Sequence, residues 1–436
     1  MKKRIVGIML CLSALAISQV PTPLDQNADK ILILNAKTHV GNGDVINKSA
    51  IGIENGKITV VANALTYRLN PDEWDTIIRV DGQELYPGFI ASNTTIGLTE
   101  IDAVRATNDF REVGFINPHI RALIAFSTDS KIIYTLRTNG VLMCQSVPRG
   151  GLISGTSSVF NLEGWNWEDA VYRRDDGIHI NWPKKITETG WWAEPGELKE
   201  NSNYVKSIKT LQAFFNSAKA YLAEKVHENF NLKYEAMTGV FEGNQNVYFH
   251  ADFAPEINDL IDFSKQFEID KPVLVGGYDA HFLAERLMEN HFSVMLSSPH
   301  KLPRFEGELP AISYELAAVL QKTGILFCIQ NHGGMEVMNA RNLPFLAGTA
   351  MGYGLTEEEA IAAISINVAK ILGIDKSVGS IEKGKNATLF VSRGNALDMM
   401  TNQVSLALVN GRFIHLTNHQ IQLAEKYAKK YGLTIR

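Results

Sequence analysis

The stretch Tyr86-Pro-Gly-Phe-Ile-Ala-Ser-Asn-Thr-Thr-Ile-Gly-Leu98 decides the fold of this chain. An apolar run ends at Pro87-Gly88, and three residues that suit a strand, Phe89-Ile90-Ala91, follow it. Small polar residues come next. A buried strand that delivers its carboxyl end into a binding site has this pattern. The stretch therefore predicts a strand whose last residues reach a functional site.

This stretch resembles the first barrel strand of the amidohydrolase superfamily, in particular its imidazolonepropionase-like branch. The family pattern is Pro-Gly, two hydrophobic residues and then Asp-x-His-x-His, whose two His residues bind a catalytic divalent metal. In this chain Ala91 stands at the Asp position, and Asn93 and Thr95 stand at the two His positions. The resemblance implies the family scaffold without its usual first-strand ligands, and it makes Asn93 and Thr95 candidate binding residues.

Length and composition indicate an ordinary globular protein. The 436 residues, of which 45% are hydrophobic and 20% charged, are enough for one large domain and one smaller one. The net charge of -5, without a basic patch interleaved with aromatic residues, argues against nucleic-acid binding. The expected ligand is a small molecule.

Residues 1–18 predict a signal peptide. Lys2-Lys3-Arg4 is a basic start, and the apolar run over residues 5–17 is too short for a membrane span. An uncleaved anchor is the alternative. Beyond this segment, Cys144 and Cys328 lie in strand-like runs, which predicts two buried free thiols rather than a disulfide. We expect an exported protein of the bacterial periplasm, with no stable membrane span after cleavage.

Both ends of the mature chain are rich in short β-like runs. Asn55-Gly56 marks a hairpin turn near the amino end, because this pair tolerates positive φ. Residues 379–387, Gly-Ser-Ile-Glu-Lys-Gly-Lys-Asn-Ala, resemble the family's path into its second set of strands. We expect residues 29–85 and 377–420 to form one composite β-sandwich domain, with a C-terminal helix over residues 421–436.

Residues 86–376 alternate strand-like and helical patterns, which predicts a parallel sheet. With this length the simplest architecture is a (β/α)8 TIM-like barrel, and a doubly wound open sheet is the alternative. One helix is locally clear over residues 356–372, because Thr356 and Glu359 suit a capping box and Gly373 fits the position after its end. The predicted fold class is α/β, a barrel inserted in a small composite β-sandwich.

A metal-dependent hydrolase needs imidazoles and carboxylates to hold the ion, and a carboxylate to take a proton from water. The family supplies that acid at the end of its last strand, where this chain has Asn331, an amide that is no general base. The run Val247-Tyr-Phe-His-Ala251 resembles the family's middle-strand motif. His250 is therefore the candidate metal ligand, and a hydrogen-bonded His at a strand end is the alternative.

Loop residues offer a replacement for the altered ligands. His300 and His332 are expected at the carboxyl ends of the strands, where they could join His250, Asp252 or Asp279 in a new metal site. A solvated loop His is the commoner outcome. Five Trp residues between residues 155 and 195 indicate either a lid over the barrel mouth or ordinary packing on its rim.

Two functions follow from these residues. The first is an exported amidohydrolase that acts on non-peptide, cyclic amide-like carbon–nitrogen bonds, with a single divalent metal such as zinc at reduced affinity. The second is a catalytically inactive subunit or ligand-binding protein without a metal, which pairs with itself or with a complete amidohydrolase. The altered ligand positions favour the second. The predicted binding residues are Asn93, Thr95, His250, Asn331 and His332, with His250 as the metal candidate.

Overall fold

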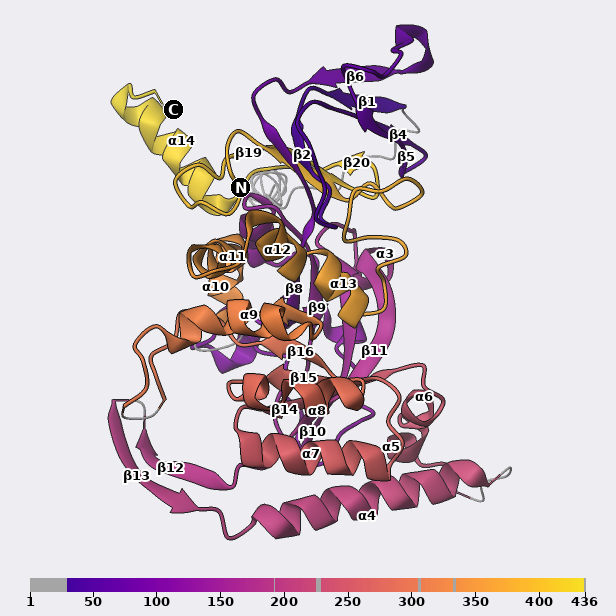
Figure 1. Ribbon diagram of the computed structural model, residues 1–436, viewed down its shortest axis with the longest axis vertical. Helices are drawn as coiled ribbons and strands as arrows, with labels where there is room; N and C mark the ends of the chain where they lie inside the picture. The colour runs from indigo at the N-terminus through magenta and orange to yellow at the C-terminus, as the bar shows by residue number, and fades with distance from the viewer. Residues whose placement is uncertain (1–29, 192, 225–228, 305–306, 332–334, 435–436) are drawn as a thin grey trace, which may run out of the picture.

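The computed structural model describes residues 30–191, 193–224, 229–304, 307–331 and 335–434 (Figure 1). The expected signal peptide and His332 lie outside these residues. Within the described ranges, no helix is both long enough and apolar enough to cross a membrane.

The largest sheet is an eight-stranded barrel with the order β17-β16-β15-β14-β11-β10-β9-β8. Its strands are β8 (Phe89–Thr94), β9 (Val141–Ser146), β10 (Ile153–Asn161), β11 (Val171–Asn181), β14 (Asn246–Ala251), β15 (Pro272–Gly276), β16 (Ser293–Leu296) and β17 (Phe327–Ile329). β10 runs antiparallel to both neighbours, and the other pairs are parallel. The prediction of an α/β barrel is confirmed, and the stretch that predicts its first strand forms β8, which is buried along its whole length.

Side chains and one turn join the two edge strands, β8 and β17. Asn93 Nδ2 donates to Gln330 Oε1 across the gap (3.1 Å). Lower in the barrel, Ile90 N donates to the carbonyl of Ile364 (2.9 Å). That carbonyl lies in a turn between α12 (Glu357–Ala363) and α13 (Ile366–Ile371), so the helix expected over residues 356–372 forms as two helices. The predicted capping box at Thr356 and Glu359 is present.

Helices surround the barrel, and most of them follow a strand (Figure 1). Besides α12 and α13 they are α2 (Lys131–Arg137), α3 (Trp167–Ala170), α4 (Tyr204–Ala223), α5 (Leu232–Glu235), α6 (Thr238–Phe241), α7 (Ala254–Gln266), α8 (Ala284–Glu289), α9 (Ile312–Thr323), α10 (Glu336–Asn339) and α11 (Leu343–Gly352). Their apolar faces bury the outer side of the strands in one large core. Cys144 and Cys328 are buried and free, as predicted.

Two smaller sheets form a β-sandwich from both chain ends. One has the order β5-β4-β1-β6 and the other β20-β19-β18-β7-β2-β3. Their strands are β1 (Ile31–Leu34), β2 (Lys37–His39), β3 (Val45–Ile46), β4 (Ser49–Glu54), β5 (Lys57–Asn63), β6 (Thr76–Arg79), β7 (Glu84–Pro87), β18 (Leu389–Ser392), β19 (Val404–Val409) and β20 (Arg412–Phe413). Because β7 pairs with β18 and the sheets share an apolar core, neither chain end completes the sandwich alone.

The chain passes straight from the sandwich into the barrel at Gly88, between β7 and β8. A Cβ at this position would lie 2.9 Å from Thr388 Cγ2 and 3.1 Å from Leu142 Cβ. The close approach of three segments explains why glycine stands here. It also fixes the orientation of the barrel, since the amino ends of the seven strands that run parallel face the sandwich and their carboxyl ends face away from it.

Two elements extend from the compact body. The hairpin of β12 (Ile186–Trp191) and β13 (Glu194–Glu200) forms a two-stranded arm beyond the carboxyl ends of the barrel strands, and α14 (His419–Tyr431) projects beside the sandwich (Figure 1). The Trp residues of this segment that the structure describes, which exclude Trp192, do not gather in one lid. Trp182 is buried against the core, whereas Trp165 and Trp191 are exposed.

Candidate functional site at the barrel mouth

Asn93, the last residue but one of the first barrel strand, has a left-handed conformation, with φ of 51°. Asn tolerates this region better than most residues. The register between β8 and β9 shifts here, between Ala91 and Thr94, as in a β-bulge. The Asn93 side chain is buried, and its backbone N donates to Gln145 Oε1 (3.0 Å). The bulge thereby directs the amide into the mouth of the barrel.

Arg149 brings a permanent positive charge to this amide. Its Nη1 donates to Asn93 Oδ1 (2.6 Å), and its Nη2 donates to the Asn93 carbonyl (2.7 Å). Nη2 also pairs with Glu336 Oε1 (3.0 Å), and both charged side chains are largely buried. A guanidinium stays protonated at any ordinary pH. A fixed cation therefore stands beside the position that the resemblance assigns to the first metal ligand.

Two imidazoles meet on the neighbouring strands. His179 Nδ1 of β11 and His250 Nε2 of β14 share a hydrogen bond of 2.9 Å. His179 Nε2 also bonds Ser157 Oγ (2.9 Å), and its ring stacks on Tyr248. Burial, followed by the nearby charges of His250 and Arg149, holds the pKa of His179 well below its usual value. His179 is therefore neutral at physiological pH.

Sequence reasoning missed His179, although a signal for it exists. Ile178 and Ile180 flank it, and the alternation of apolar and polar residues indicates a strand that presents His179 on the face opposite the isoleucines. The parallel register then sets Asn181 opposite His250 and His179 opposite Tyr248. The two imidazoles therefore stand on neighbouring strands two register positions apart, close enough for their ring nitrogens to meet.

A buried carboxylate lies below the two imidazoles. Asp176 Oδ2 accepts from Tyr248 OH (2.6 Å) and from Gln145 Nε2 (2.9 Å). Burial raises the pKa of Asp176, and its hydrogen bonds partly oppose that shift. Because Gln145 also holds the backbone of Asn93, this carboxylate, the imidazole pair and the Arg149 group belong to one hydrogen-bonded network.

The remaining predicted residues lie in different surroundings. Thr95 is buried just after β8. Asn331 turns its amide toward the carbonyl of Glu336, which accepts from Asn331 Nδ2 (2.9 Å). His300 Nε2 bonds Thr349 Oγ1 (2.7 Å). The structure thus joins Asn93 and His250 to the mouth network and brings neither Asn331 nor His300 to the imidazole pair.

A cavity of about 340 Å³ opens beside His250 at the carboxyl ends of the strands. Its walls come from residues that follow β11, β14, β15, β16 and β17, among them Trp182, Asp252, Lys301, Arg304 and Gln330. Ligand sites of barrel enzymes lie at this end. A larger hollow of about 630 Å³ lies outside the barrel beside the Arg121 and Asp175 ion pair, away from the imidazoles, and we regard the mouth cavity as the candidate site.

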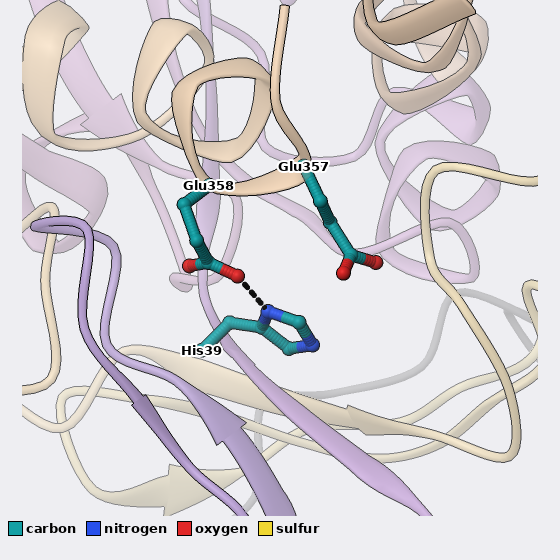
Figure 2. A group of neighbouring side chains, drawn as sticks. All are labelled: His39, Glu357 and Glu358. Carbon is teal, nitrogen blue, oxygen red and sulfur yellow. Dashed lines mark hydrogen bonds and ion pairs between the residues drawn. The ribbon is translucent and has the colours of Figure 1, made fainter.

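The described residues place three close metal-type donors at one location only, and it lies at the opposite end of the barrel. His39, Glu357 and Glu358 have ligand atoms within 4.8 Å of one another (Figure 2). His39 Nδ1 lies 2.5 Å from Glu358 Oε1, and its Nε2 lies 3.3 Å from Glu84 Oε2. Lys37 Nζ lies 3.5 Å from Glu357 Oε2. Two cationic groups therefore already pair with these carboxylates, between the sandwich and α12.

Comparison with known proteins defines the class. The chain has the amidohydrolase fold, a barrel with a β-sandwich, and residues 316–414 match the sequence model of the amidohydrolase family. The crystal structure of an amidohydrolase from Thermotoga maritima MSB8 superposes with a TM-score of 0.76 at 24% identity, and the match covers 88% of this chain and 100% of that one.

The chain spans less than two thirds of the length of the curated relatives that it matches. The amidohydrolase tasK of Hapsidospora irregularis is 19% identical over 80% of this chain, and the match spans 37% of the relative. An imidazolonepropionase of Flavobacterium psychrophilum is 23% identical over 54% of this chain and 60% of the relative. A solved adenosine deaminase from Xanthomonas campestris, which has bound zinc, shares the fold with a TM-score of 0.53 at 13% identity, over 94% of this chain and 98% of that one.

Proposed function

We propose that this chain is a small-molecule-binding member of the amidohydrolase fold whose barrel mouth does not carry out metal-assisted hydrolysis. The Arg149 guanidinium carries this proposal. It pairs with Asn93 at the first-strand ligand position, where a divalent ion would meet a fixed positive charge instead of an imidazole. Amides at Asn93 and Asn331 are poor zinc ligands and cannot accept a proton from water at neutral pH.

The donors left at the mouth fit a ligand-binding role. His179 and His250 use ring nitrogens on each other, and among the residues that the structure describes no carboxylate or third imidazole completes a three-donor cluster with them, as a zinc site requires. Around them stand amides and a hydroxyl, from Gln145, Gln330 and Ser157. Such groups orient a small molecule through hydrogen bonds and supply no Lewis acid.

Metal content tests the proposal. We would measure zinc, manganese, iron and cobalt in the untagged, purified chain by elemental mass spectrometry, with His250→Ala and His179→Ala as variants. We expect the wild-type chain to contain far less than one metal ion per chain at the mouth, and we expect both variants to have the same metal content as wild type. About one ion per wild-type chain, lost in both variants, would contradict the proposal.

Two control variants make the measurement specific. His300→Ala removes an imidazole that bonds Thr349 outside the mouth network. His39→Ala removes the histidine of the cluster in Figure 2. Metal that survives His250→Ala and disappears with His39→Ala belongs to the far end of the barrel and leaves the proposal for the mouth intact.

A second candidate function is hydrolysis of non-peptide, cyclic amide-like carbon–nitrogen bonds with one zinc ion. The observation that favours it is the distance of 2.9 Å between the two imidazole nitrogens, which are close enough to share an ion after a small rotation. The imidazolonepropionase relative supports this chemistry by its name. Hydrolysis of hydantoins or cyclic ureides that stops with a chelator and returns with zinc would establish it.

We also propose export to the bacterial periplasm, on the sequence of residues 1–18, and association with a second copy or with a complete amidohydrolase, on the resemblance to the family. Cell fractionation with detection of the processed amino terminus tests the first. Light scattering of the purified chain, alone and mixed with a complete family member from the same cell, tests the second.

A further inference from the structure

The mouth cavity contains one partly buried positive charge that the described part of the chain does not neutralise. Three basic residues line it, Lys184, Lys301 and Arg304, and two acidic ones, Asp252 and Glu256. Their pairing decides what the cavity can bind, because an unpaired charge in a partly buried site is costly until a counter-ion arrives.

Arg304 and Asp252 neutralise each other. Arg304 Nη2 lies 2.8 Å from Asp252 Oδ2. The guanidinium also lies over the rings of Phe253 and Tyr278, at 5.3 and 5.4 Å from their centres. These contacts fix Arg304 as part of the wall.

Glu256 is also committed within the protein. It sits in the first turn of α7, and its Oε1 accepts from the backbone N of Lys185 (2.7 Å). Burial raises the pKa of Glu256, although backbone hydrogen bonds oppose that shift. Backbone N–H groups donate hydrogen bonds to the Glu256 carboxyl, so this carboxyl is stabilised without an ion pair to a lysine.

Lys301 is the partly buried basic residue of the cavity that has no ion-pair partner among the described residues. It is half-buried in the loop after β16, and no carboxylate of the described residues lies within ion-pair distance of its Nζ. Burial lowers the pKa of Lys301, and the neighbouring charges of Arg304 and Lys184 act in the same direction against the pull of Asp252. Lys184 stands exposed at the rim, where water solvates it.

We propose that Lys301 anchors the carboxylate of a small organic acid in this cavity. This inference rests on the proposed function, since it names the ligand class of the same barrel mouth. One partly buried ammonium matches one negative charge, and the volume of about 340 Å³ suits a molecule near the size of an acylated amino acid. The amides of Asn181 and Gln330 line the same cavity. Trp182 supplies an apolar wall.

The test compares acids with matched neutral molecules. We would titrate the full chain with N-acetyl amino acids of graded size, with their N-acetyl amino acid amides, and with phosphoserine and glycerol phosphate, and detect binding by ligand-observed NMR and calorimetry. We expect acids to bind at least about tenfold more tightly than their amides, because a charge-assisted hydrogen bond is lost in the amide. We expect phosphomonoesters to bind more weakly than the acids.

Variants tie the preference to one side chain. Lys301→Met should weaken binding of the acid about tenfold and leave binding of the amide unchanged, whereas Lys301→Arg should keep part of the preference. Lys209→Met, on the exposed side of α4, is the matched control and should change neither. A bound acid should also protect Lys301 from acetylation by acetic anhydride, as read by peptide mass spectrometry, which requires no folded variant.

Several results would overturn the inference: equal binding of acids and amides, an unchanged preference in Lys301→Met, tighter binding of phosphomonoesters, or no acid bound at 10 mM, a concentration about tenfold above a weak 1 mM dissociation constant. These failures differ from failure of the proposed function. An ion at His179 and His250 would refute the metal-free mouth and leave the acid preference measurable, whereas a metal-free protein that ignores the charge of its ligand would refute only the role of Lys301.

Discussion

At the residue scale, Arg149 has the largest effect on what the barrel mouth can do. It links three groups from distant parts of the chain, the side-chain and backbone oxygens of Asn93 and the carboxylate of Glu336. The guanidinium matches these acceptors with parallel N–H groups, a geometry that lysine does not reproduce. Arg149 therefore supplies positive charge and rigidity at the end of the first strand.

Removal of this guanidinium should destabilise the protein strongly. Arg149→Met would remove the charged donor from the buried Glu336 carboxylate and from the Asn93 carbonyl, and we expect a loss of about 2–4 kcal/mol in the free energy of unfolding. Urea denaturation followed by circular dichroism measures it. The control is Arg79→Met, at an exposed arginine of β6, which should stay within about 0.5 kcal/mol of wild type. Equal denaturation midpoints for the two variants would refute the structural role of Arg149.

At the element scale, the junction of β7 and β8 couples the sandwich to the barrel. Thr388 of the sandwich and Leu142 of β9 both approach Gly88 within contact distance of an added Cβ. A single side-chain carbon here therefore pushes the two parts of the molecule against each other, and the strain falls on the strand that carries Asn93.

Gly88→Ala should destabilise the fold by about 1–3 kcal/mol, the usual effect of overpacking. Gly352→Ala is the control, because that glycine ends α11 with no atom within 4 Å of the added carbon. This control should be neutral or slightly stabilising. Thermal unfolding of both variants checks the pair, and Thr388→Ser in the Gly88→Ala background should recover part of the loss. If the Gly88→Ala protein were as stable as the Gly352→Ala protein, the junction would accommodate the added methyl group without strain.

At the scale of the whole molecule, His39 connects the sandwich to helix α12 on the outside of the barrel. It lies on β2, stacks on Tyr86 and contacts Glu84 of β7. On its other side it pairs with Glu358 of α12 (Figure 2). Burial opposes its protonation, yet the hydrogen bonds to Glu358 and Glu84 outweigh burial and raise the pKa of His39 above 6.5. The hydrogen bond to His39 is the main reason that the pKa of Glu84 falls below 4.5.

These two shifts set the pH range of the contact. A raised histidine pKa gives stability that is complete below pH 6.5 and is lost as the pH rises through the higher folded value, and a lowered carboxyl pKa gives stability that is complete above pH 4.5 and is lost as the pH falls. Lys37 and Glu357 also face this group and moderate its net charge.

His39→Gln should therefore lose most stability relative to wild type between pH 4.5 and 6.5, and the difference should shrink toward pH 9. Urea unfolding at intervals across this range measures it. His415→Gln, at an exposed histidine, is the control and should run parallel to wild type. A constant difference between wild type and His39→Gln from pH 5 to 9 would mean that the imidazole acts through packing alone.

The sequence by itself determined the elements and the scaffold. Local patterns were sufficient for the first strand after Pro87-Gly88, for the capping box at Thr356 and for the sandwich built from both chain ends, because neighbouring residues set backbone preference and apolar periodicity. The family resemblance singled out Asn93 and His250 because a short motif maps position onto position, and both side chains lie in the mouth network.

Only the tertiary structure decided which groups meet in the mouth. Arg149 is 56 residues from Asn93 and 187 from Glu336, and His179 is 71 residues from His250. A buried polar group takes its partner from whatever the fold packs against it, and sequence distance carries no information about that choice. The break at Ile364 has the same origin, because its carbonyl accepts the N–H of Ile90 from the barrel. Motif and periodicity therefore gave the scaffold, while the fixed cation and the imidazole pair depend on long-range packing.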